Sequence, residues 1–300
     1  MNIGTCAMGY ATHSPLLQPK NDVLKREHSA TKYTATARRI NAMTNVGPSW
    51  TSDQLKSDPH ANPEKATRVQ SMFSAIAPSY DLNNRIHSFG LDQSWRKRTV
   101  REVAARLGSL RDKKVLDVAC GTGDLTELFY KAGANTTGGD YTPAMLEIAK
   151  IKSRKFNDAS DRIRYVNADA NKLQFDNASF DAVTIAFGLR NVSSPDKAIA
   201  EFFRVLRPGG VLAILEFDQP KSRIVRFFHN LYTERVMPLT ATLIARDRSG
   251  AYKYLPRSVA TFLSPQGIAQ FAAASGFKHI QHYSLTCGTC ALTLCTRPLV

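Results

Sequence analysis

The chain has 300 residues, 43% of them hydrophobic, which is enough for one sizeable α/β domain with attachments or for two small domains, and excludes wholesale disorder. Its 40 basic and 25 acidic side chains give a formal net charge of +15, which favours an anionic neighbour such as nucleic acid or a bilayer surface, unless the basic residues are simply solvated. No stretch approaches the roughly 18 consecutive apolar residues of a spanning helix, and the 5 scattered cysteines argue against a disulfide framework, so both of those classes are excluded.

Residues 1–66 are predicted to be an irregular leader, because Thr, Ser, Asn, Lys and Arg are frequent there and prolines interrupt the segment. Acidic residues are few before Met43, as in an organellar transit peptide, although the first 19 residues contain no Lys or Arg. A translation start at Met43 is the alternative that we slightly favour. A transit peptide predicts a protein of the mitochondrial matrix, and its absence predicts a cytoplasmic one.

Residues 67–300 are predicted to form the folded domain. Apolar residues recur at helical spacing from Thr67, and a second amphipathic helix is predicted at Trp95–Leu107. We expect these helices to form an N-terminal lid over residues 67–110. The long connection 218–263 is predicted to be an inserted cap over the substrate.

Strands and helices alternate after the lid. Strands are predicted at 114–120, 135–140, 163–169, 180–187 and 210–217. Helices between them are predicted at 143–156 and 195–206, and such alternation is typical of a parallel sheet with helices on both faces. Two final strands, 279–286 and 290–296, predict an antiparallel hairpin. The expected fold class is therefore α/β, a doubly wound, mostly parallel seven-stranded sheet.

Two cysteines at the end of the chain, Cys287 and Cys290, have C-x-x-C spacing. A zinc site needs a second pair of ligands, and the sequence offers no convincing pair. We interpret these residues as the turn and the strand start of the hairpin, and we expect no metal.

The loop after the first predicted strand carries the strongest local signal for chemistry. Gly121 and Gly123 flank Thr122 between a buried strand and a helix, where glycines let a ligand approach the amides of a helix N-terminus. The dinucleotide fingerprint G-x-G-x-x-G is absent, because Thr126 stands where its third glycine would be. Asp117 before the loop suits an amino acid ammonium and not a pyrophosphate. The pattern favours S-adenosylmethionine over a dinucleotide.

Further acidic residues end the next two predicted strands. Asp140 ends the second strand, where a carboxylate can accept both hydroxyl protons of a ribose. Asp169 and Ala170 end the third, where a carboxylate and a backbone amide would lie beside an adenine edge. A single aspartate at a strand end is often only a turn residue or a helix cap, but three at successive strand ends favour a ligand site.

These residues together resemble the S-adenosylmethionine site of class I methyltransferases. The segments that resemble the menaquinone/ubiquinone C-methyltransferase family more narrowly are Phe73–Asp81, Phe187–Val192, Arg204–Gly210, Leu215–Phe217 and Tyr252–Leu255. The resemblance covers roughly residues 70–297. It implies an enzyme that transfers a methyl group from S-adenosylmethionine to a ring carbon of a prenylated hydroquinone. Demethylmenaquinol is the favoured acceptor, with a benzoquinol of the ubiquinone pathway as the alternative.

The chain departs from that family's pattern at four positions. Relatives usually have Met where this chain has Asn83, and His where it has Asp92, and both positions are expected to line the lid and to affect substrate fit. Many have Ser at Asp218. A small hydroxyl residue is common at Ala186, so its replacement removes one hydrogen bond near the methionine end of the cofactor.

Ring methylation requires a quinol whose hydroxyl has lost its proton. Arg190 follows the fourth predicted strand and is our first candidate for stabilising the resulting oxyanion. It cannot act as a conventional base, because a guanidinium stays protonated in proteins. Tyr80 and Asp81 on the lid are the candidate routes for the proton, besides water. A structural ion pair at Arg190 and a helix-end turn at Tyr80 and Asp81 are the alternatives.

The cap segment 221–257 contains 8 basic and 2 acidic residues, with aromatic side chains between them. Such a pattern suits single-stranded nucleic acid or an anionic bilayer surface that a prenyl tail enters. The absence of an RNA-binding or base-methylation motif favours peripheral membrane contact, and we expect no nucleic acid partner. Methylation of another lipid such as a sterol, a catalytically silent assembly protein and a homo-oligomer stay open.

Overall fold

The computed structural model describes residues 49–51, 53–156, 161–245 and 250–299. Its centre is a seven-stranded sheet with the order β3-β2-β1-β4-β5-β7-β6. The strands are β1 (Lys114–Val118), β2 (Asn135–Asp140), β3 (Ile163–Asn167), β4 (Phe180–Ala186), β5 (Leu206–Phe217), β6 (Lys278–Leu285) and β7 (Cys290–Thr296).

The first five strands are parallel, whereas β7 pairs antiparallel with both β5 and β6. The predicted mostly parallel sheet with an antiparallel C-terminal hairpin is therefore confirmed. The order of the strands reverses between β1 and β4, so the loops that follow these neighbours diverge and leave a crevice at the carboxyl ends.

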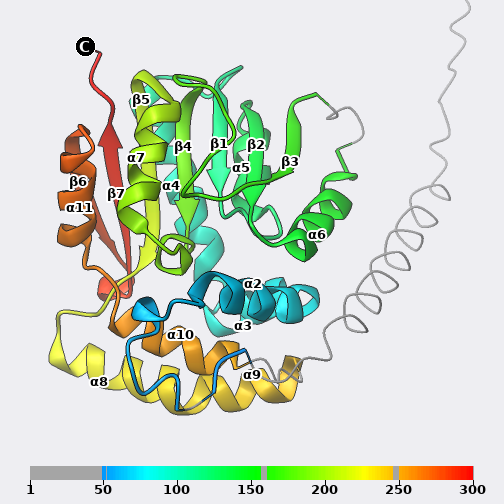
Figure 1. The fold of residues 1–300 in the computed structure, drawn as a ribbon, viewed down its shortest axis with the longest axis vertical. Coiled ribbons are helices and arrows are strands. Elements are labelled where there is room, and N and C mark those ends of the chain that lie inside the picture. The colour runs from blue at the N-terminus through cyan, green and yellow to red at the C-terminus, as the bar shows by residue number, and fades with distance from the viewer. Residues whose placement is uncertain (1–48, 52, 157–160, 246–249, 300) are drawn as a thin grey trace, which may run out of the picture.

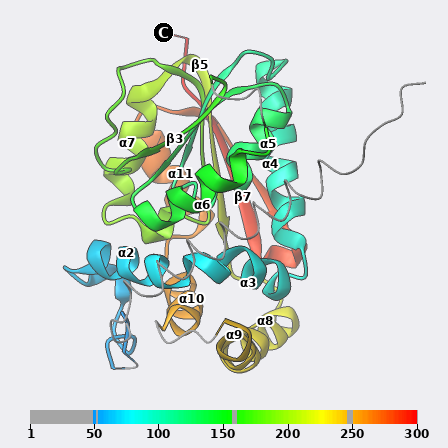
Figure 2. The ribbon, with the colours of Figure 1, turned by 90° about the vertical axis from the view of Figure 1, so that its right-hand side faces the viewer.

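Helices cover both faces and one end of the sheet (Figures 1 and 2). Figure 1 shows α2, α3, α8, α9 and α10 gathered at one end, with the C-terminus at the other. The helices are α2 (Lys65–Ile76), α3 (Tyr80–His87), α4 (Leu91–Leu107), α5 (Asp124–Lys131), α6 (Pro143–Ser153), α7 (Pro195–Val205), α8 (Arg223–Leu231), α9 (Met237–Ala245), α10 (Ala251–Ala260) and α11 (Pro265–Ala274).

Strand β5 shows why the sheet needs helices on both faces. Leu212 and Ile214 pack on one side with α7 and α11, while Val211, Ala213 and Leu215 pack on the other with α4 and α5. Side chains alternate between the two faces of a strand, so a continuous apolar run is stable only where both faces are buried.

Several element bounds differ from the prediction. Strand β5 starts at Leu206 and not at residue 210, because its pairing with β4 continues through an irregular stretch that Gly209 accommodates at a φ of 76°. Strand β3 ends at Asn167, before Asp169. The helix predicted from Trp95 starts at Leu91. The predicted turn at Cys287 and strand start at Cys290 are confirmed, because a short 3₁₀ helix, η5 (Thr286–Gly288), precedes β7.

A third apolar cluster lies between the sheet and the end helices. It joins Met145 of α6 to Met72 of α2, Met237 of α9 and Tyr254 of α10. Trp50 stacks on Tyr254 with ring centroids 5.0 Å apart, so packing on the domain already begins before residue 67. The predicted leader up to residue 48, with Met43, lies outside the described residues. Among the described helices, none is long and apolar enough to cross a bilayer.

Candidate functional site

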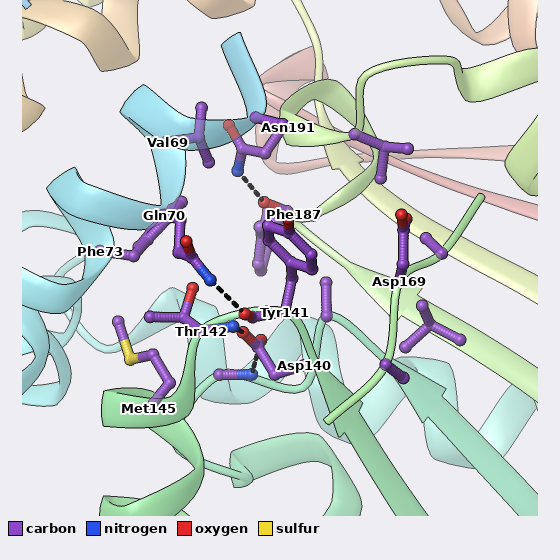
Figure 3. Close-up of a pocket in the computed structure, with 18 of the residues that line it drawn as sticks. Val69, Gln70, Phe73, Asp140, Tyr141, Thr142, Met145, Asp169, Phe187 and Asn191 are labelled. Carbon is purple, nitrogen blue, oxygen red and sulfur yellow. Dashed lines mark hydrogen bonds between the residues drawn. The ribbon is translucent and has the colours of Figure 1, made fainter. Parts of the chain in front are cut away.

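A cavity lies at the carboxyl ends of the central parallel strands, beneath α2 (Figure 3). It encloses about 840 Å³ of empty space, its open mouth included. Figure 3 shows Gln70 and Phe73 of α2 on one side and Asp140 at the end of β2 below them. Its lining includes Gly121, Asp140, Tyr141, Met145, Asp169 and Ala170.

Asp140 is held in place by two backbone donors. The N–H of Gly121 donates to one carboxylate oxygen at 2.8 Å, and the N–H of Thr142 donates to the other at 2.7 Å. Burial raises the pKa of this carboxyl above its ordinary value, although both hydrogen bonds favour the charged form. Each oxygen keeps a second lone pair, so the carboxylate can accept two further protons such as those of ribose hydroxyls.

Asp169 and Ala170 line the same cavity after the end of β3. The carboxylate of Asp169 is exposed and accepts the N–H of Asn171 at 2.9 Å. Ala170 is buried. An open carboxylate beside small apolar side chains fits the amino edge and the flat face of a purine.

Of the residues predicted in and before the glycine loop, only Gly121 lines the cavity. Asp117, Thr122 and Gly123 are buried and do not belong to the lining. The carboxylate of Asp117 accepts the hydroxyls of Thr126 at 2.6 Å and Thr184 at 3.0 Å, and burial raises its pKa to about 6. The structure therefore encloses Asp117 beneath the loop, and a direct contact with an ammonium stays a prediction.

A second cavity, enclosing about 1690 Å³ with its open mouth, lies between the lid helices and the cap. Its walls are mainly aromatic and aliphatic side chains from α2, α3, α4, α10 and the π-helix η4 (Tyr232–Val236). Both cavities have Phe73, Tyr80 and Phe187 in their linings. A methyl donor bound in the first cavity and a methyl acceptor bound in the second would meet at these three residues.

Arg190 lines the second cavity and is buried. Its Nη1 donates to Oε1 of Glu216 at 2.7 Å and to the carbonyl of Phe187 at 2.6 Å. Its backbone N–H donates to the other oxygen of Glu216 at 3.2 Å. The buried Nε has no partner among the described residues, so the guanidinium retains a donor for a ligand oxygen.

The structure separates the two residues that were predicted to take the proton. Tyr80 lines both cavities, and burial raises the pKa of its phenol, which therefore stays protonated at neutral pH. Asp81 is absent from both linings. It accepts Nζ of Lys152 at 2.6 Å and the hydroxyl of Thr122, and Lys152 also pairs with Asp124 at 2.7 Å. Asp81 thus joins the lid to α5 and α6, and its catalytic role stays a prediction.

Several residues that line the second cavity, or that position its lining, were not predicted from the sequence. Glu216 positions Arg190, and its place beside Phe217 in a resembling motif was the available signal. Arg96 packs over the ring of Phe187, 5.1 Å from its centroid, but appeared in the sequence only as part of a polar helix face. His87 lines the cavity without any motif to indicate it.

The four positions at which the chain departs from the family pattern line the two cavities. Asn83 and Asp92 line the second cavity, as expected, and so does Asp218. Ala186 lines the first cavity.

The sheet order, the crevice and the acidic strand ends define a class I S-adenosylmethionine-dependent methyltransferase. The model of the ubiE/COQ5 methyltransferase family matches residues 61–297, and the chain belongs to this family. It is 42% identical to a demethylmenaquinone methyltransferase of Thermus thermophilus, over 76% of this chain and 100% of that protein. It is 39% identical to a ubiquinone/menaquinone biosynthesis C-methyltransferase UbiE of Shewanella piezotolerans, over 76% of this chain and 90% of that protein.

Solved structures support the fold. A phosphoethanolamine N-methyltransferase 2 of Haemonchus contortus, solved with S-adenosyl-L-methionine, gives a TM-score of 0.50 at 16% identity, over 67% of this chain and 52% of that one. An S-adenosyl-L-methionine-dependent methyltransferase assigned in Methanococcus maripaludis gives 0.50 at 14% identity, over 74% and 92%. Within the described residues, no group of three or more His, Cys, Asp or Glu side chains is arranged to hold a metal ion.

Proposed function

We propose that this enzyme methylates a ring carbon of a prenylated hydroquinone, converting demethylmenaquinol to menaquinol. The proposal rests on two cavities that meet at Phe73, Tyr80 and Phe187. The smaller one contains the fixed carboxylate of Asp140, and the larger one is mainly apolar. The names of the Thermus and Shewanella relatives support a quinone pathway. A benzoquinol fits the same cavity chemistry and is the alternative ring.

S-adenosylmethionine, when bound, supplies an electrophilic methyl group. Asp140 would hold its ribose, Asp169 and Ala170 its adenine, and the backbone at Gly121 its amino acid end. The residues fit this group because Asp140 is fixed by two N–H donors with lone pairs to spare, and because Gly121 lines the cavity at a φ of 55°.

The protein's own contribution to the reaction is orientation and charge. Arg190 offers its unpartnered Nε to the oxygen of the ring hydroxyl that ionises, and Glu216 keeps the guanidinium in place. Aromatic side chains around the ring, including Trp95 and Phe217, exclude water from the reacting carbon. Tyr80 lies where the cavities meet and can orient the ring through its protonated hydroxyl.

A methyl-transfer assay with labelled S-adenosylmethionine tests this function. Reduced demethylmenaquinol and a demethylated benzoquinol, each with a short prenyl tail, are offered in separate anaerobic reactions. We expect label to enter the naphthoquinol. The amount of label that enters the benzoquinol should be lower by about tenfold or more. Label in neither quinol, in protein that binds S-adenosylmethionine, would contradict the proposed acceptor.

We further propose that α8 rests on an anionic bilayer, which is where a prenylated quinol resides. The side chains of Ile224, Phe227 and Phe228 on α8 are 72%, 65% and 63% exposed, an unusual density of exposed apolar groups for one helix. The exposed basic residues beside them are Lys221, Arg223, Arg226 and Arg235. His229 and Asn230, on the same helix, line the second cavity, so the apolar surface is continuous with its rim.

The double substitution Phe227→Ser/Phe228→Ser is expected to lower binding to phosphatidylcholine vesicles containing phosphatidylglycerol by roughly 100-fold, because two exposed aromatic side chains no longer enter the interface. Vesicle sedimentation measures this, with Leu299→Ser as the control, since Leu299 is at least as exposed and lies near the C-terminus, at the opposite end of the molecule (Figure 1). Equal binding by both variants would contradict the bilayer contact. The molar mass of the protein in solution, measured by light scattering, gives the alternative outcome. A molar mass that rises with protein concentration in the wild type, and is lower in the double variant, would instead assign this surface to a second copy of the chain.

A further inference from the structure

Helix α3 buries a polar side chain and exposes apolar ones, which is the opposite of an ordinary amphipathic helix. Asn83 is fully buried, whereas Leu82 and Ile86 are 55% and 40% exposed. Residues three and four positions apart lie on one face of a helix, so Tyr80, Asn83 and His87 form one row. All three line the second cavity. A lid helix therefore presents hydrogen-bonding groups to a cavity whose other walls are mainly apolar.

The amide of Asn83 presents an acceptor. Its Nδ2 donates to the carbonyl of Ser79 at 3.0 Å, which fixes the orientation of the amide. Its Oδ1 is buried and has no hydrogen-bond partner among the described residues. A buried acceptor without a partner costs about 1–3 kcal/mol, which a ligand donor would offset.

His87 presents a second acceptor one helical turn away. The hydroxyl of Tyr232 lies 3.2 Å from the backbone carbonyl of His87 and 3.4 Å from Nδ1 of its ring. In the tautomer that satisfies both contacts, the hydroxyl donates to the carbonyl and Nδ1 donates to the hydroxyl. In the neutral ring Nε2 then carries the lone pair. This Nε2 is buried without a partner, and burial lowers the pKa of the imidazole, which keeps it neutral at neutral pH.

We propose, on the basis of the proposed quinol methylation, that Asn83 and His87 form an acceptor subsite for a hydroxyl of the ring, and that this subsite selects the hydroquinone over the oxidised quinone. The two ring oxygens meet opposite environments. Arg190 offers only donors, which suit an oxygen that becomes an anion. The unpartnered atoms of the subsite, Oδ1 of Asn83 and Nε2 of His87, are acceptors, which suit a hydroxyl that keeps its proton. A quinone carbonyl has no hydrogen to donate, so it leaves both acceptors unpaired.

Equilibrium binding of the two redox forms tests the subsite without relying on turnover. The ligands are demethylmenaquinol with a single isoprene unit, held reduced under anaerobic conditions, and its oxidised quinone. Trp95 lines the second cavity, so quenching of its fluorescence reports occupancy in the full chain. We expect the wild type to bind the quinol about tenfold or more tightly than the quinone.

Asn83→Leu is expected to reduce this ratio of dissociation constants about tenfold, by weakening the quinol and sparing the quinone. The matched control is Asn135→Leu. This change also removes a hydrogen bond from a side-chain amide to a backbone carbonyl, that of Asp112, but Asn135 does not line the second cavity. His87→Leu tests the same subsite at a half-buried position if Asn83→Leu does not fold. An unchanged ratio in the folded variants would overturn the subsite.

The outcomes also separate this inference from the proposed function. Selective quinol binding that Asn83→Leu abolishes, without methyl transfer by the wild type, would keep the subsite and refute the proposed function. Methyl transfer by the wild type, with an unchanged ratio of the quinone and quinol dissociation constants in Asn83→Leu, would support the function and refute the subsite. A wild type that binds neither redox form would refute both.

Discussion

Replacing Asp140 by alanine is expected to weaken S-adenosylmethionine binding by about 10²–10⁴-fold, because two hydrogen bonds to a charged group are lost at once. The carboxylate is buried and is held in place by the N–H groups of Gly121 and Thr142. Isothermal titration of the full chain with S-adenosylmethionine measures the effect directly.

The control for this variant is Asp181→Ala. Asp181 also lies in a strand of the sheet and accepts a backbone N–H, that of Lys114 at 2.7 Å, but it belongs to neither cavity lining. It should lose stability without losing affinity for S-adenosylmethionine. An Asp140→Ala protein that is folded and binds the cofactor normally would refute the ribose assignment.

The position of Asp140 could be predicted because it depends only on topology. A carboxylate that ends a parallel strand next to the switch point must lie at the crevice, whatever the side chains around it. The same reasoning placed Asp169 and Ala170 correctly on the cavity wall. Strand alternation and the position of loops are local properties of the sequence, and the sheet follows from them.

The surroundings of Asp117 and Asp81 could not be predicted, because they depend on partners distant in the chain. The hydroxyl of Thr184 on β4 donates a hydrogen bond to the buried carboxylate of Asp117. The ammonium of Lys152 on α6 forms an ion pair with Asp81. A motif identifies an acidic residue but not the groups that neutralise it. A single sequence carries no signal for such pairings.

The lid was the least predictable part of the site. A hydrophobic pattern assumes that apolar residues face inward. Helix α3 breaks this assumption, with Leu82 exposed and Asn83 buried, because its inner face lines a cavity. Sequence reasoning fails most readily at sites where function overrides packing.

Replacing Arg190 by methionine is expected to lower kcat for methyl transfer by about 10²–10³-fold, since the donor to the developing oxyanion is lost. The same change leaves Glu216 as a buried carboxylate without its cation, which should cost about 3–5 kcal/mol of unfolding free energy. Loss of activity in this variant alone would therefore fit either a catalytic cation or a structural ion pair.

The double variant Arg190→Met/Glu216→Leu separates these two roles. Both charges are removed, so most of the lost stability should return, because a buried ion pair can often be replaced by apolar side chains of similar size at little cost. Thermal denaturation measures the recovery, and kcat at saturating S-adenosylmethionine measures the chemistry. A stable but inactive double variant assigns the oxyanion role to Arg190. Activity that returns together with stability would show that Arg190 and Glu216 serve only to hold the end of β5 against the loop after β4.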